Sequence, residues 1–309
     1  MNETLVPEFS PIKESLERIH LGEMKSYGGL LVFPLLGPDI EGLDYALLQE
    51  AYERGWVKVQ EEESAKVEEI LLDNTYDQAI FALDGEELVG AKQNRVLNTS
   101  LLVPSKSKLS VPVSCVEQGR WGGGRDFRVE EKLQNIRGRA KRVKSVAKSM
   151  IRNGTARSNQ REVWEDISSK ESRMSSYSPT SDMDQLYQSN MERLNAYEDR
   201  FKAEPDQIGI IFAIPGLVGL ELFDRQSTFK ALLKKILRSY SIEAIEDQSF
   251  ADFSRKDSVA FLKRFQSLNW VQKKSVGSGE DWRSDFVLFT ASALVQQNIC
   301  LHLGAYITR

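Results

Sequence analysis

The chain has 309 residues, of which 41% are hydrophobic and 28% charged, the composition of an ordinary soluble globular protein rather than of a disordered, fibrous or disulfide-stabilised one. Lys+Arg 41 against Asp+Glu 45 gives a net charge of -4, so only a local patch would attract nucleic acid or an anionic membrane. No secretory signal, transit peptide or membrane span is readable, and the two cysteines, Cys115 and Cys300, fit a reduced compartment, so we expect a cytoplasmic protein.

The first part of the chain is predicted to be rich in β-strands. Residues 1–26 are acidic and weakly periodic, and we interpret them as an N-terminal extension. Residues 43–54 carry apolar side chains at helical spacing, and Gly55 is a suitable helix end. Strands are expected at 30–36, 56–60, 66–72 and 79–83.

Two further strands are expected at 96–103 and 109–116, on either side of a polar connection of hairpin length. In the second strand the odd-numbered residues from Leu109 to Cys115 are apolar and therefore share one face. Pro112 has no N–H to donate to a neighbouring strand, which indicates an edge strand or a bulge.

Charge is segregated along the chain. Residues 120–157 contain 12 Lys/Arg and 3 Asp/Glu, a balance of +9, which leaves 29 against 42, or -13, for the rest. Apolar residues from Leu133 to Met150 recur at steps of three and four, which predicts one amphipathic helix. A basic stripe on this helix consists of Arg137, Lys141, Lys144 and Lys148. Such a stripe is usually a solvated face, and here it is also a candidate docking arm for an acidic protein partner.

The rest of the chain alternates helices and hairpins. A serine-rich loop is expected at 168–181, helices at 183–201, through 232–237 and at 254–268, a hairpin of 207–214 with 217–223, and a closing hairpin of 286–295 with 299–305. The predicted class is α+β, with a largely antiparallel β-sheet core from both ends of the chain and a helical insert in the middle. The expected parts are the extension 1–26, a β-rich part 27–126, a basic helical insert 127–204 and an α+β part 205–309 that completes one domain with 27–126.

The densest polar chemistry lies in residues 84–121. The segments DGEELVGAKQNRVLNTS, beginning at Asp84, and VPVSCVEQGRW, ending at Trp121, concentrate acid, amide and guanidinium groups beyond what solubility requires. With a fainter match from Gly279 to Ala305, they resemble the bacterial ADP-ribosylglycohydrolase- and rhodanese-phosphatase-associated protein domain family, over roughly residues 28–305. That family has no established reaction, and its name implies a link to NAD and ADP-ribose metabolism.

The resemblance implies a protein that binds an ADP-ribose-like or nucleotide-sugar ligand and can hydrolyse it; it identifies no cofactor. The alternative is a non-catalytic binding or protein-interaction module that uses the same polar surface. Only two histidines, His20 and His302, are present, which excludes a multi-histidine metal site. A catalytic site would therefore rely mainly on carboxylates, amides and arginines, and we expect no metal, no nucleic acid and no membrane as partner.

Glu117 and Glu86 are the candidate catalytic carboxylates, because two acids in unlike environments can hold separated pKa values and act as acid and base or nucleophile. The competing interpretation of Glu86 and its neighbour Glu87 is a solvated turn. Cys115 is a candidate nucleophile, but its place on the apolar strand face favours an inert, buried thiol.

The candidate ligand-binding residues offer positive charge or planar donors and acceptors. They are Lys92, Gln93, Asn94, Arg95, Asn98, Arg120 and Trp121. Arginine suits phosphate, the amides suit a base or ribose, and a tryptophan ring can stack on adenine. The competing interpretations are a buried hydrogen-bond network for the amides and core packing for Trp121. Glycines 122–124 lack the Lys-Ser/Thr of a phosphate loop and are interpreted as a flexible connector.

Overall fold

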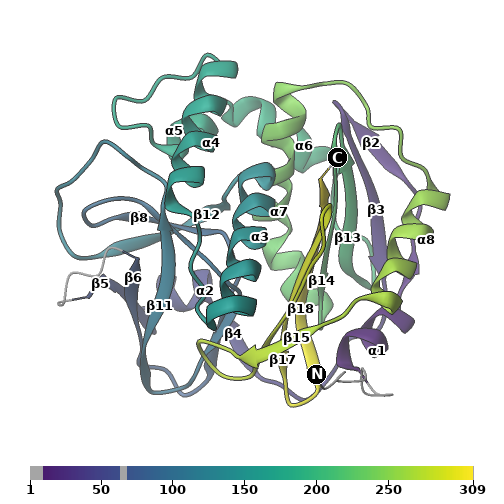
Figure 1. Cartoon of the computed structure of the whole chain (residues 1–309), viewed down its shortest axis with the longest axis horizontal. Coiled ribbons are helices and arrows are strands. Elements are labelled where there is room, and N and C mark those ends of the chain that lie inside the picture. Colours follow the sequence, from purple (N-terminus) through teal and green to yellow (C-terminus); the bar gives the residue numbers. More distant parts are fainter. Residues whose placement is uncertain (1–9, 63–67, 309) are drawn as a thin grey trace.

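A computed structural model of the chain describes residues 10–62 and 68–308 (Figure 1). This part consists of antiparallel sheets combined with helices, which confirms the α+β class. Among the described strand pairs, β4 with β7 is parallel and the others are antiparallel. No helix within these residues is both long enough and apolar enough to cross a lipid bilayer.

The largest sheet has nine strands and lies on the right in Figure 1, in the order β1-β3-β13-β14-β18-β17-β16-β15, with β2 paired to β3. Its strands are β1 (His20–Leu21), β2 (Lys25–Tyr27), β3 (Leu30–Leu36), β13 (Gln207–Ile214), β14 (Leu217–Phe223), β15 (Val271–Lys274), β16 (Glu280–Asp285), β17 (Phe289–Gln296) and β18 (Ile299–Thr308). The two predicted C-terminal hairpins are therefore confirmed. Gln297 and Asn298, with φ of 50° and 61°, form the two-residue turn between β17 and β18, the backbone that such hairpins favour.

Both faces of this sheet are buried. Leu30 and Val32 face the helices α3 (Ile136–Asn153) and α7 (Gln226–Glu246), whereas Leu31 and Phe33 face α1 (Pro11–Glu17) and α8 (Arg255–Arg264). Because alternate residues of a strand point to opposite faces, a strand covered on both sides is apolar throughout. All 8 residues of β13 are buried for this reason.

The other strands form two smaller sheets on the left in Figure 1, with the orders β12-β8-β9-β11-β6-β5 and β10-β7-β4. Their bounds are β4 (Tyr45–Leu47), β5 (Val57–Glu61), β6 (Glu69–Asn74), β7 (Ala79–Ala82), β8 (Glu86–Gly90), β9 (Arg95–Leu97), β10 (Leu101–Val103), β11 (Ser107–Cys115) and β12 (Phe127–Leu133). In the described part of the chain, the β-rich ends thus share a sheet only through β1, β2 and β3.

The segment interpreted as an extension is structured from residue 10 onward, and residues 1–9 lie outside the described residues. α1 packs on β18, and both β1 and β2 pair with β3. The expected strand at 66–72 begins, within the described residues, at Glu69.

The predicted hairpin of 96–103 with 109–116 is partly wrong. The first segment is two strands, β9 and β10, and only β9 pairs with β11. β11 lies between β9 and β6 and is not an edge strand. Pro112 stands where β11 ends its pairing with β6 and begins its pairing with β9, a position that tolerates a missing N–H.

The remaining helices are α2 (Leu48–Glu53), α4 (Gln160–Arg173), α5 (Met183–Gln188) and α6 (Met191–Arg200), with a 3-10 turn η1 (Phe265–Ser267) after α8. The loop expected at 168–181 begins only after Arg173, because Lys170 of α4 is buried against Glu243 and Glu246 of α7 at 2.8 and 2.5 Å. The helix expected at 183–201 is divided into α5 and α6, and the one expected at 43–54 starts with β4.

Helices α3 and α7 lie where the nine-stranded sheet meets the two smaller sheets. α3 contacts β16 and β17 of the large sheet, and α7 contacts both β13 and β12, which belong to different sheets. Figure 1 shows α3 and α7 in the middle of the molecule, with α4 above the smaller sheets. The predicted amphipathic helix thus lies at the junction, where it can meet charged groups from both sides.

Candidate functional site

The two sequence motifs meet at one place, which we call the motif cluster: Asn94, Glu117, Arg120, Thr180 and Asp182. The side chain of Glu117 is 5% exposed, and Nε of Arg120 lies 2.9 Å from each of its oxygens, with Nη2 at 2.7 Å. Glu117 also accepts hydrogen bonds from the N–H of Asn94 at 3.1 Å and from the hydroxyl of Thr180 at 3.0 Å. Both carboxylate oxygens are therefore engaged.

Arg120 ties three chain segments together. It donates to the backbone oxygens of Ala91 and Gly90 at 2.7 and 3.1 Å and to Oδ1 of Asn94 at 2.9 Å. Nδ2 of Asn94 donates to Asp182 at 3.0 Å, and Asp182 caps α5 by accepting the N–H of Asp184. One guanidinium and one amide thus hold the loop after β8, the second motif and the start of α5 in register.

A further carboxyl group, Glu87, lies beside this cluster, and its side chain has no hydrogen-bond partner among the described residues. Burial raises the pKa of Glu87 to about 8, opposed by Lys132 and supported by the charges of Asp182, Glu130 and Glu117. Burial also raises the pKa of Asp182 to about 6, with Asn94 lowering it and Glu117 raising it. Two carboxyl groups that titrate near neutral pH thus surround the Glu117–Arg120 pair, a feature frequent at functional sites.

The outer rim of the motif cluster is open to solvent. Trp121 is 63% exposed, so it is not a core residue, and the side chain of Arg120 is 29% exposed. The N–H of Gly119 donates to the oxygen of Thr180 at 2.8 Å, which joins the loop of Trp121 to the loop of Tyr177, an aromatic residue that is 81% exposed. Two solvated rings therefore come from two loops in direct contact.

Lys92 follows Ala91, whose backbone oxygen accepts from Arg120, and its side chain is half-buried. A Cβ added to Gly122 or Gly124 would meet nothing within 4 Å, so the backbone beside Trp121 is accessible.

Gln93 and Arg95 are buried and bonded to each other. Arg95 is 1% exposed and donates to the side-chain and backbone oxygens of Gln93 at 3.3 and 3.1 Å, and it lies 3.6 Å from the carboxylate of Glu61. Gln93 donates to the oxygen of Gln118 at 3.3 Å. These groups fix the crossing of the two motifs and leave little surface for a ligand.

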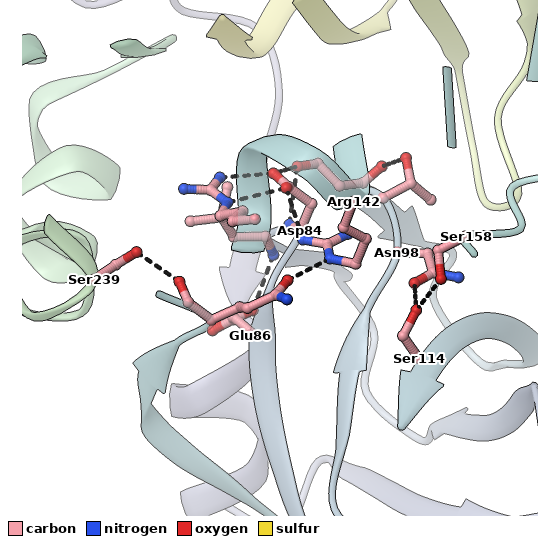
Figure 2. A network of polar contacts seen from close by, with 12 residues as sticks. Asp84, Glu86, Asn98, Ser114, Arg142, Ser158 and Ser239 are labelled. Carbon is pink, nitrogen blue, oxygen red and sulfur yellow. Dashed lines mark hydrogen bonds and ion pairs between the residues drawn. The ribbon is translucent and has the colours of Figure 1, made fainter. Parts of the chain in front are cut away.

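Asn98 is likewise part of an internal network. It donates to the oxygen of Ala156 at 3.0 Å and accepts from Ser114 at 2.5 Å, and Ser114 lies 2.5 Å from the hydroxyl of Ser158 (Figure 2). The network joins β11 to the segment between α3 and α4.

The structure does not bring Glu86 to Glu117. Glu86 pairs with the buried Lys235 of α7 at 2.5 Å and accepts the N–H of Leu83 at 2.9 Å. Neighbouring residues of a strand leave opposite faces, so Glu87, rather than Glu86, points toward the motif cluster. Both glutamates are buried, in contrast to the solvated turn that was the competing interpretation.

Cys115 is buried, and burial raises its pKa. Its backbone N–H and oxygen are bonded to the side chain of Gln160 at 2.7 and 2.8 Å. His302 makes no hydrogen bond with Cys115 in the described part of the chain and instead contacts Ser100 and Glu221. A thiol in this setting is that of a structural residue.

A second group of charges, absent from the sequence-based candidates, lies at the centre of the molecule. We call Asp84, Arg139, Arg142, Glu221 and His302 the central cluster. Arg139 donates to Asp84 at 2.7 and 3.0 Å and to Glu221 at 2.6 Å. Arg142 contacts Asp84 at 3.2 Å (Figure 2), and His302 lies 2.7 Å from Glu221. These side chains are at most 4% exposed.

Ser100, His302 and Glu221 form a chain of hydrogen bonds with the composition of a hydrolase triad, at 3.0 and 2.7 Å. Glu221 is, however, also bonded to Arg139 and Tyr306, and Ser100 accepts the N–H of Asp84. The central cluster is thus a closed network. One sequence signal could have revealed part of it: position 139 lies three residues after Ile136 and four before Val143, at the edge of the apolar stripe of the helix, where a charge is unexpected.

The basic stripe is partly neutralised within the chain. Arg137 pairs with Glu243 at 3.2 Å, and Lys141 pairs with Asp166. Lys144 donates to the backbone oxygen of Val287 at 2.6 Å. Within residues 10–62 and 68–308, no group of three His, Cys, Asp or Glu side chains is arranged to hold a metal ion.

Comparison with known proteins yields one match. The family model described as the ARG and Rhodanese-Phosphatase-superfamily-associated Protein domain covers residues 18–306, a span that includes both clusters. No curated protein and no solved structure matches the chain.

Proposed function

Because the chain belongs to the ARG and Rhodanese-Phosphatase-superfamily-associated Protein domain family, we propose that it binds an ADP-ribose-like or nucleotide-sugar ligand at the rim of the motif cluster. The family name records an association with ADP-ribose-related proteins. The observation that carries the proposal is a 63% exposed tryptophan next to Arg120, above buried carboxyl groups.

Each part of such a ligand has a matching group at the rim. An exposed indole offers a flat surface on which a base can stack, and Tyr177 offers a second ring from the adjoining loop. Arg120 and Lys92 supply positive charge for a diphosphate, and the guanidinium can bind it with two parallel hydrogen bonds. The accessible backbone of Gly122 and Gly124 allows a ligand to approach closely.

Hydrolysis is the second part of the proposal, with Glu117 and Asp182 as the carboxylates that act on the ligand. A phosphate that binds Arg120 competes with Glu117 for the same N–H groups and so frees a Glu117 oxygen, which takes a proton from the water that attacks the N-glycosidic or phosphoester bond of the ligand. Asp182, with its pKa near 6, can then donate a proton to the leaving group, since a catalytic acid works best when its pKa is close to the ambient pH. Glu86, which Lys235 holds, has no part in this scheme.

The alternative is binding without turnover. It is favoured by the full set of hydrogen bonds that Glu117 already makes to Arg120, Asn94 and Thr180. In this case the same rim recognises the ligand, and the carboxylates serve to hold Arg120 in place.

The test is to incubate the pure protein with NAD and with ADP-ribose, recording the melting temperature and the masses of the products. A raised melting temperature with a new product supports the hydrolase, and a raised melting temperature without product supports the binding module. No response in either measurement rejects the proposed ligand class.

Substitutions test whether the ligand-induced shift of the melting temperature arises from binding at the rim. We expect Trp121→Ala to abolish the ligand-induced shift, whereas Phe250→Ala, a matched change at another exposed aromatic residue, retains it. Glu117→Gln and Asp182→Asn are expected to remove product formation, and full turnover by a folded Glu117→Gln variant would exclude Glu117 from the reaction.

A further inference from the structure

Three consecutive apolar side chains are exposed at the turn between β16 and β17. Phe286 is 48%, Val287 86% and Leu288 54% exposed. The chain turns tightly here, since the N–H of Phe286 donates to the oxygen of Phe289 at 2.8 Å. Tight turns usually use Gly, Asn, Asp or Pro, whose backbone or short polar side chains suit the turn, and this one uses none of them. The geometry of the turn therefore does not explain why these three exposed positions carry apolar residues.

The turn is attached to the basic stripe of α3. Lys144 donates to the backbone oxygen of Val287 at 2.6 Å. Lys141 and Lys148 stand three residues before and four residues after Lys144, which places them on the same side of the helix. Both are exposed. The apolar turn thus contacts the middle of a row of cations.

We infer that the turn 286–288 and the row Lys141, Lys144 and Lys148 together form a docking surface for an acidic segment of a partner protein that also carries apolar side chains. Contiguous exposed apolar residues next to charge are typical of interaction surfaces. Apolar residues of the segment would pack on Val287 and Leu288 while its carboxylates face Lys144 and Lys148, which have no acidic partner among the described residues. None of these residues belongs to the motif cluster, so the inference is independent of the proposed ligand.

The charge pattern favours a peptide segment over a flat membrane. The row extends along the helix axis for about 10 Å from Lys141 to Lys148, the shape of a short extended or helical segment. The chain outside residues 120–157 carries a formal charge of -13. An anionic bilayer would face much of that negative charge, whereas a short segment meets only the lysines.

The experiment measures fluorescence anisotropy of a labelled synthetic peptide that alternates Glu and Leu pairs. Two control peptides replace Glu by Lys or Leu by Ser. We expect the acidic, apolar peptide to bind, with affinity that falls as salt is added, and both controls to bind on the order of tenfold more weakly.

Variants locate the binding. Leu288→Ser and Lys148→Glu should each weaken the peptide complex by about tenfold without changing the melting temperature. The matched variants Val259→Ser and Lys263→Glu, at an exposed apolar and basic face of α8, should not weaken it. Absence of peptide binding, or equal binding by all four variants, overturns the inference. Binding to vesicles of phosphatidylcholine and phosphatidylglycerol, but not to the peptide, assigns the surface to a membrane and also overturns it.

Discussion

The motif cluster and the central cluster are both built on an arginine bonded to carboxylates, but they differ in their access to solvent. The side chain of Arg139 is 0% exposed and that of Arg120 is 29% exposed. Burial alone would raise the pKa of Asp84, yet Arg139 and Arg142 outweigh it and hold that pKa well below its usual range. In the motif cluster the pKa of Asp182 is raised instead, and so is that of Glu87 beside it.

The difference separates a structural use of charge from a chemical one. In the central cluster Arg139 of α3 joins Asp84, which follows β7, to Glu221 of β14. It therefore connects a smaller sheet to the nine-stranded sheet. A buried, densely paired network fixes how these elements meet and is closed to solvent, although Nη1 of Arg142 has no hydrogen-bond partner among the described residues. The motif cluster and its surroundings keep a partly exposed cation, an exposed ring and carboxyl groups that titrate near neutral pH.

The largest expected effect comes from Arg139→Met. The substitution leaves Asp84 and Glu221 buried without their main partner, and breaking such a pair costs about 3–5 kcal/mol. Urea unfolding measures this loss in the free energy of unfolding. Arg161→Met, at a side chain that is 86% exposed, is the control and should stay close to wild type. If Arg139→Met cost as little as this control, the central cluster would have no structural role.

Glu87→Gln tests the neutral, buried acid. A carboxyl group whose folded pKa is near 8, above the ordinary 4.5, keeps its proton in the folded state while the unfolded chain loses it. Wild-type stability therefore falls as the pH rises from about 4.5 to 8, and glutamine, which does not titrate, escapes this loss. We expect the advantage of the variant over wild type to grow by about 4 kcal/mol between pH 4.5 and pH 8, at about 1.36 kcal/mol per pKa unit.

Thermal unfolding at acidic and at mildly alkaline pH measures this difference. Below pH 4.5 the advantage of Glu87→Gln should disappear, because both states of the wild-type protein then carry the proton. The exposed Glu192→Gln is the control and should show no pH-dependent gain. A gain that is the same at every pH would contradict a raised pKa at Glu87.

Arg120→Met is expected to cost less than Arg139→Met, about 1–2 kcal/mol, because solvent reaches the guanidinium and Glu117 retains hydrogen bonds from Asn94 and Thr180. Urea unfolding of the two variants side by side checks the order. An equal or larger cost at Arg120 would show that solvent access does not separate the two clusters.

The smallest effect on stability is expected for Trp121→Ala, within about 0.5 kcal/mol, since exposed side chains contribute little to packing. Thermal unfolding without ligand makes the measurement. A substantial loss of stability would mean that the indole supports the fold. Its exposure would then no longer be an argument for ligand binding at the rim.

Much of the fold could be predicted from local pattern. The amphipathic spacing of α3, the Pro215-Gly216 turn between β13 and β14, and the Gln297-Asn298 turn all depend on residues close in sequence. The two motifs could also be identified, and Asn94, Glu117 and Arg120 do come together.

The choice of partners could not be predicted in the same way. β10 pairs with β7 and not with β11, and Lys170 extends α4 into the serine-rich run because it reaches carboxylates of α7. Whether a given strand or charge finds its partner depends on segments more than 50 residues away in many of these contacts, as with Asn94 and Asp182, where the separation is 88. The spacing of apolar residues within a short stretch of sequence carries no information on such long-range pairs.

The sequence by itself determined the α+β class, the main helices and hairpins, the segregation of charge and the two motifs, because these follow from spacing and turn chemistry within short stretches. Only the tertiary structure decided that Glu87, and not Glu86, approaches Glu117, that Arg139 and Arg142 turn the basic segment inward onto Asp84 and Glu221, and that Trp121 faces solvent. Burial and ion pairing depend on which residues far apart in sequence become neighbours in the structure. Those neighbours are determined only when the chain has folded.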